Sequence, residues 1–164
     1  MQLVKSIALL ALLVFSFACT KDSLGDPSPE SGMEVERTIW AGNNITFSKA
    51  NAADPTLAEN QDRITDLVWI TRDNGGGQIY NVKSESQAAS GSSPKGTLWA
   101  IGSIDEIDDL DFRTFRSAVG KPKDVVGKDL VLQLVEEKIF LQVQFTSWSN
   151  QGGGGFTYER STPE

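Results

Sequence analysis

The chain has 164 residues, the length of about one domain, and its 15 Lys and Arg against 22 Asp and Glu give a formal net charge of −7. It contains no histidine and one cysteine. This composition excludes His-dependent catalytic triads, His-ligated zinc and an intrachain disulfide. The acidic balance also argues against a nucleic-acid-binding surface, so we expect no nucleic acid among the partners.

Residues 1–18 read as an export signal. Lys5 precedes a short apolar run that ends in small residues, and the run falls short of the roughly 20 residues that a membrane-spanning helix needs. Ala18 is followed by Cys19, the one cysteine of the sequence. Residues 16–19, Ser-Phe-Ala-Cys, resemble the lipobox of bacterial lipoproteins. The resemblance implies cleavage before Cys19, lipidation of its thiol and anchoring in the bacterial outer membrane. The alternative is an ordinary signal peptide that ends near a cysteine.

Residues 19–37 form the next segment, rich in acids and with almost no apolar side chains. Such a segment cannot bury enough surface to offset its ordering entropy, which predicts a disordered acidic linker after the lipidated cysteine. Lys21 and Asp22 resemble the lysine-acid signals that direct some lipoproteins to the cell surface. A generic polar spacer on the periplasmic face is the alternative.

The folded domain is expected over residues 38–162 and begins with β-type patterns. A weak strand is expected at residues 39–48. Residues 63–72 and 78–83 flank the turn sequence Asp-Asn-Gly-Gly-Gly, which supplies the positive φ angles of a tight hairpin. A further weak strand is expected at residues 97–101.

One helix interrupts the strands. Phe112, Phe115 and Val119 recur at i, i+3 and i+7, which predicts an apolar stripe on a helix over residues 112–119. Asp111 is the expected N-cap, and Gly120 is expected to end the helix.

The clearest hairpin joins residues 129–135 to residues 138–148, because every second side chain in both is apolar and forms one apolar face. A shift by one residue would oppose leucines to glutamines, so the pattern fixes the parity of the pairing. The predicted pairs are Leu134 with Ile139, Leu132 with Leu141 and Leu130 with Val143.

A last hairpin is expected between residues 145–148 and 156–160, through a loop that contains four consecutive glycines. About seven strands with glycine turns and one short helix predict an all-β fold, an antiparallel β-sandwich or jelly-roll.

The domain contains VWITR at residues 68–72, SSPKGTLWAIG at 92–102 and FTSW at 145–148. With these segments, most of the domain resembles one that recurs in exported bacterial proteins and has no assigned activity. It implies a self-contained secreted module and transfers no catalytic residue. The remaining matching segments are residues 53–65, 79–81 and 152–163.

Acidic residues suggest one metal site. Asp54 and Asp62 lie in a polar, acid-rich segment, and acidic loops can hold a structural Ca²⁺. The alternative is a turn held by hydrogen bonds of the Asp side chains. No other cofactor is expected.

The aromatic residues of the last hairpin suggest a binding site. With Phe156 opposite Trp148 and Tyr158 opposite Thr146, the three rings would form one exposed patch flanked by Gln144 and Arg160. Aromatic, amide and guanidinium groups suit stacking on sugars or docking of a protein. The alternative is that these rings are core.

These patterns favour a lipid-anchored, exported, non-catalytic module that binds a glycan or an envelope protein. Two other functions stay open: a small hydrolase with a carboxylate pair, for which no spacing selects the two acids, and a purely structural envelope component.

Overall fold

The computed structural model describes residues 36–164. In this part of the chain there is no helix long and apolar enough to cross a membrane. The predicted signal, the lipidation site at Cys19 and nearly all of the predicted linker lie outside the described residues.

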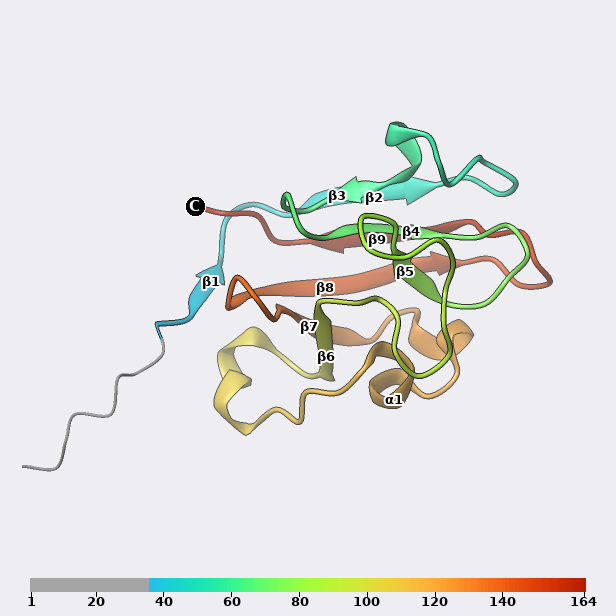
Figure 1. The fold of residues 1–164 in the computed structure, drawn as a ribbon. Helices are drawn as coiled ribbons and strands as arrows, with labels where there is room; N and C mark the ends of the chain where they lie inside the picture. The colour runs from blue at the N-terminus through green and yellow to red at the C-terminus, as the bar shows by residue number, and fades with distance from the viewer. Residues whose placement is uncertain (1–35) are drawn as a thin grey trace, which may run out of the picture. The chain divides into compact units, whose positions relative to one another are not determined.

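The larger of two sheets has the strand order β2-β9-β8-β7-β6, with antiparallel neighbours throughout (Figure 1). One short strand departs from the predicted antiparallel pattern: β1 pairs in parallel with the beginning of β8, from Thr38 opposite Ile139 to Trp40 opposite Leu141. The strands of this sheet are β1 (Thr38–Trp40), β2 (Ile45–Lys49), β6 (Thr97–Ile101), β7 (Asp129–Leu134), β8 (Ile139–Trp148) and β9 (Phe156–Arg160).

The smaller sheet has the order β3-β4-β5 and contains the hairpin predicted from residues 63–72 and 78–83. Strands β4 (Trp69–Arg72) and β5 (Ile79–Asn81) pair across the glycine turn, from Ile70 opposite Asn81 to Arg72 opposite Ile79. The expected single strand over residues 63–72 is wrong, because Ile64 N donates to Val68 O and the chain folds back there. The residues before this turn form β3 (Asp62–Arg63), which pairs with β4.

The predicted helix is present but shorter than expected. The residues expected to begin the helix pair with β6 instead, because the backbones of Arg113 and Trp99 exchange two hydrogen bonds, at 2.7 and 2.9 Å. Helix α1 (Phe115–Val119) therefore begins after Thr114, and Asp111 is not its cap. Gly120 ends the helix as expected, with a φ of 77°. The other helical segments are short 3₁₀ helices: η1 (Ala58–Asn60), η2 (Ile104–Asp109), which is kinked at Glu106, and η3 (Pro122–Val125).

The β7–β8 hairpin is confirmed residue by residue. Leu134 lies opposite Ile139, Leu132 opposite Leu141 and Leu130 opposite Val143. The three leucines of β7 are 0–1% exposed, so the period of two in the sequence did identify the face that packs into the main core.

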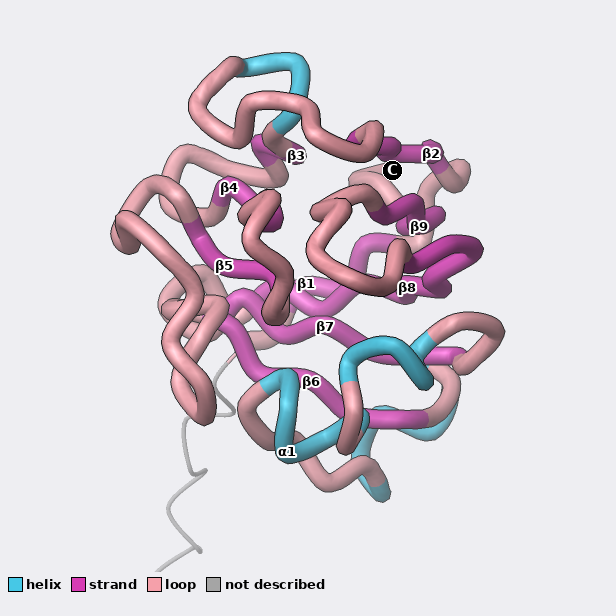
Figure 2. Tube along the Cα trace, turned by 90° about the vertical axis from the view of Figure 1, so that its right-hand side faces the viewer, coloured by secondary structure: helices cyan, strands magenta, loops and turns pink. Residues whose placement is uncertain are grey.

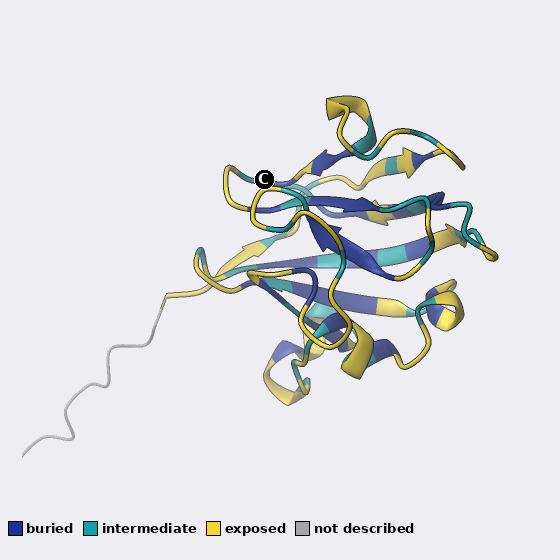
Figure 3. Cartoon of the chain, turned by 45° about the vertical axis from the view of Figure 1, so that its right-hand side comes forward, coloured by how far each residue is buried: buried dark blue, intermediate teal, exposed yellow. Residues whose placement is uncertain are grey.

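The two sheets share one core. It contains Ile70 and Ile79 from the smaller sheet, Leu132 and Leu141 from the larger one, and Phe115 from α1. The strands are mostly buried, whereas the helical turns are largely exposed (Figure 3). Figure 2 shows α1 beside β6, at the end of the sheet remote from β2.

The outer face of the larger sheet carries a smaller apolar cluster. Val131 and Phe140 pack there against Ile107 of η2, and the rings of Phe140 and Phe112 meet edge to face at 5.5 Å. The predicted all-β fold is confirmed: two sheets, built mainly of antiparallel strands, pack on a common core as in a β-sandwich.

Candidate functional site

The hairpin between β8 and β9 forms as predicted, but a bulge changes which side chains face the core. Trp148 lies opposite Phe156 as expected, whereas Tyr158 lies opposite Phe145 instead of Thr146. One extra residue of β8 is accommodated between Phe145 and Ser147. Because side chains alternate along a strand, the extra residue places Phe145 and Trp148 on the same, inner face.

The predicted exposed aromatic patch is therefore wrong. Phe156 and Tyr158 are each 1% exposed and belong to the main core. Trp148 is half-buried, with ring centroids 5.7 Å from Phe145 and 6.2 Å from Phe115. Of the flanking residues, only Gln144 lies partly at the surface, where its Nε2 donates to Asp129 at 2.8 Å.

Arg160 is buried in an ion pair that connects the two sheets. Its Nε and Nη2 donate to the two carboxylate oxygens of Asp62 on β3, at 2.7 and 2.9 Å. The hydroxyl of Tyr158 donates to the same carboxylate at 2.6 Å. Burial lowers the pKa of Arg160, but the hydrogen bonds and charge of Asp62 outweigh it and give a net rise. The pKa of Tyr158 is raised well above its usual value by burial and by the charge of Asp62.

This ion pair gives Asp62 a role other than the predicted calcium ligand. Asp62 is 6% exposed as a residue, and both oxygens of its carboxylate accept hydrogen bonds from Arg160, so its charge is already balanced. Asp54 instead forms the turn that was the alternative: its Oδ1 accepts from the backbone N and the hydroxyl of Thr56, both at 2.8 Å. These hydrogen bonds lower the pKa of Asp54. Residues 36–164 contain no group of three or more potential metal ligands.

A second buried cation, Arg72, lies at the end of β4 against Trp148. Its guanidinium carbon is 4.0 Å from the centre of the Trp148 ring. Its nitrogens donate at 3.0 Å to the carbonyls of Gly77, Ser149 and Gly155. Burial lowers the pKa of Arg72. Among the described residues, the ion pairs recorded do not include Arg72, so carbonyl dipoles and an aromatic ring compensate its charge.

Lys49 provides a third buried cation on the other side of the same hairpin. Its ammonium donates to Asn74 Oδ1 at 2.8 Å and to the carbonyl of Gly154 at 3.3 Å. Burial lowers the pKa of Lys49, and the charge of Arg72 lowers it further. Arg72 and Lys49 together fix the glycine-rich segment between β8 and β9 to the rest of the domain.

A hollow of about 350 Å³ opens beside Trp148, where the tip of the β8–β9 hairpin meets the β4–β5 loop and the segment after α1. Four cations line it, and we call it the basic hollow. Arg72 is buried, whereas the other three cations are exposed and take part in no ion pair recorded for the described residues. None of the described residues that line it is acidic. Its principal side chains are Arg72, Arg116, Lys121, Lys123, Trp148, Asn150 and Gln151.

Sequence reasoning missed this site. Lys121 and Lys123 look like ordinary loop lysines, and Arg72 looks like the end of a strand. Arg116 and Arg72 are far from each other in the chain, and no spacing rule connects them. The one available signal was the opposite sign of this short lysine group in a chain of net charge −7.

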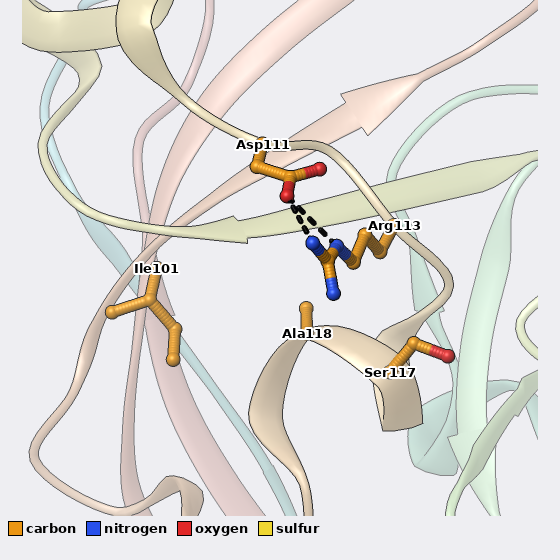
Figure 4. Close-up of a pocket in the computed structure, with 5 residues that line it drawn as sticks. All are labelled: Ile101, Asp111, Arg113, Ser117 and Ala118. Atoms are coloured by element: carbon orange, nitrogen blue, oxygen red, sulfur yellow. Dashed lines mark hydrogen bonds and ion pairs between the residues drawn. The ribbon is translucent and has the colours of Figure 1, made fainter.

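A smaller hollow of about 200 Å³ lies between α1 and the end of β6 (Figure 4). Its charged groups are Asp111 and Arg113, which form an ion pair with each other and point into the same space (Figure 4). The pairing raises the pKa of Arg113, chiefly through the hydrogen bonds to Asp111. With its charges satisfied internally, this hollow offers a ligand less than the basic hollow does.

Compared with known proteins, the chain matches no family model, no curated protein and no solved structure.

Proposed function

We propose that the chain is an exported lipoprotein whose β-domain is a non-catalytic module that binds a glycan at the basic hollow. The lipid on Cys19 anchors it in the bacterial outer membrane, facing the periplasm or the exterior. The signal-like N-terminus, the lipobox-like residues and the resemblance to a domain of exported proteins support the first part. A multi-acyl anchor is physically sufficient, since one chain binds membranes weakly and two or more hold firmly.

The observation that carries the binding part is the construction of the hairpin tip. Asn150 and Gln151 are exposed at the rim of the basic hollow, and primary amides both donate to and accept from sugar hydroxyls. The contacts of Arg72 with Ser149 and Gly155 hold this tip against the sheet. A site held in place before the ligand arrives loses less entropy on binding.

The test is binding of the full-length chain to a panel of immobilised neutral and acidic polysaccharides. The variant Asn150→Ala/Gln151→Gly removes both rim amides, and glycine suits position 151 because its φ is 58°. We expect binding to at least one polysaccharide and a loss of about tenfold in the variant, from the loss of two or three hydrogen bonds.

The matched control Asn44→Ala/Gln87→Ala removes two exposed amides that lie outside the hollow and should bind as the parent does. Binding to no polysaccharide, or equal loss in both double variants, would overturn the proposal.

The anchor is tested separately. Cys19→Ser removes the thiol that would carry the lipid, so the chain should stop incorporating a labelled fatty acid and leave the membrane fraction. Incorporation that persists in this variant would refute lipidation at Cys19.

A further inference from the structure

We infer that the ligand of the basic hollow is an acidic glycan, one that carries carboxylate or sulfate groups. This deepens the proposed function and rests on it, because it names the class of glycan that the same site accepts. The four cations that line the hollow come from three separate parts of the chain: the end of β4, helix α1 and the turn η3 with the residue before it.

Three exposed cations of the basic hollow lack an acidic partner among the described residues. Elsewhere in the described residues two exposed arginines have acidic partners, in the pairs Arg113–Asp111 and Arg37–Asp108, and the exposed Arg63 lies against the Trp69 ring. Arg116, Lys121 and Lys123 have no acidic partner within the described residues and converge on one hollow without an acidic lining residue. Like charges gathered in a concave site focus a positive potential there, which favours an anionic occupant.

The buried Arg72 adds a positive charge that no carboxylate among the described residues neutralises. Its charge is met by carbonyls and by the Trp148 ring rather than by a carboxylate. A formal positive charge therefore remains at the wall of the hollow, where low-polarity surroundings screen it less than water would. An anion bound at the rim gains from this charge without having to displace a competing acid.

The size of the hollow and the net charge of the chain favour a glycan over a nucleic acid or a membrane as the ligand. The volume of about 350 Å³ lies at the small end of the range for sites that take small molecules or short segments of a chain. The cations form one hollow and not an extended stripe, and the chain as a whole has a net charge of −7. Duplex DNA, whose charge is much denser than that of an acidic polysaccharide, or an anionic bilayer would meet stronger repulsion outside the hollow.

The experiment compares polygalacturonate with fully methyl-esterified polygalacturonate, which has the same backbone but no free carboxylates. Binding of the full-length chain is measured by affinity electrophoresis and calorimetry at 50 and 300 mM salt. We expect the free acid to bind at least tenfold more tightly than the ester, and its affinity to fall as salt rises. The double variant Lys121→Gln/Lys123→Gln should lose about tenfold in affinity for the acid and little for the ester.

The matched control is Lys83→Gln/Lys95→Gln, which removes the same charge from exposed lysines outside the hollow and should bind as the parent does. Equal binding of acid and ester, or equal loss in both lysine variants, would overturn the inference while leaving a neutral-glycan function standing. Binding to duplex DNA or to phosphatidylglycerol vesicles that is tighter than binding to polygalacturonate would also overturn the inference. Failure to bind either polysaccharide, or any other glycan of the panel, would instead remove the proposed function itself.

Discussion

Replacing Asp62 by Asn tests the buried ion pair that connects the two sheets. Asp62 on β3 neutralises Arg160 on β9, and the ion-paired side chains are both 7% exposed. Asparagine keeps the shape of Asp62 but leaves the guanidinium without a counter-charge. Removing one partner of a buried pair costs about 3–5 kcal/mol, a large fraction of the roughly 5–15 kcal/mol that stabilises a typical domain.

The free energy of unfolding is measured by urea titration at pH 7, followed by tryptophan fluorescence. We expect a loss of about 3–5 kcal/mol, with a fall in melting temperature of roughly 10–20 °C for a domain of this size. The triple variant Asp62→Leu/Tyr158→Phe/Arg160→Met removes the charges and the hydroxyl together. It should be more stable than Asp62→Asn, because no buried charge is left without its counter-charge.

The control is Asp111→Asn, which breaks the exposed pair with Arg113 and should leave the unfolding midpoint essentially unchanged. A loss below about 1 kcal/mol for Asp62→Asn would refute the reasoning, since that is the range of exposed ion pairs. A triple variant no more stable than Asp62→Asn would refute it as well.

Three further predictions concern the β8–β9 hairpin. Trp148→Ala removes a half-buried ring that packs on Phe115 and Phe145, and we expect a loss of about 2–4 kcal/mol in urea titration; an unchanged midpoint would show that the ring contributes little to the core. Gly154→Ala should lower the melting temperature clearly, because the glycine has a φ of 72° and an added Cβ would lie 2.5 Å from Asn74 Oδ1, whereas Gly75→Ala, with nothing within 4 Å of its Cβ, should behave as the parent does. Burial and the nearby Asp62 charge raise the pKa of Tyr158, so its contribution to stability is complete below pH about 10 and is lost as the pH rises from there through the folded-state pKa; Tyr158→Phe should reduce this alkaline loss in unfolding experiments, and an identical pH dependence would contradict the assignment.

The fold was predictable where every second side chain of a strand is apolar. On β7, Leu130, Leu132 and Leu134 occupy every second position, and one face of the strand is buried. A slip of one residue would bury glutamine, so the sequence specifies the β7–β8 register without help from the rest of the domain.

The aromatic patch was unpredictable for a related reason. Alternation predicts the facing of a side chain only while the pairing is uninterrupted, and the bulge after Phe145 reverses it for Trp148. Nothing in the residues Phe-Thr-Ser-Trp marks that position in advance. The shortened helix has a similar origin, because the backbone pairing of Arg113 with Trp99 overrides the apolar spacing of Phe112.

The basic hollow depends on tertiary structure alone. Arg72, Arg116 and Lys121 approach one another because the β4–β5 loop, α1 and η3 meet at the end of β8. Sequence reasoning weighs charges mainly by their neighbours along the chain, and along the chain these residues are ordinary.

The parallel pairing of β1 has a mechanical consequence. Strand β1 has three residues, two of them exposed, and it lies beside the first residues of β8. In a protein held by its N-terminal end, any pull reaches β1 before the other strands. Peeling it away would lengthen the connection by about 10 Å, at roughly 3.4 Å per residue, while the five-stranded order from β2 to β6 stayed intact. Strand β1 is thus placed to detach first if the chain is pulled from its N-terminal end.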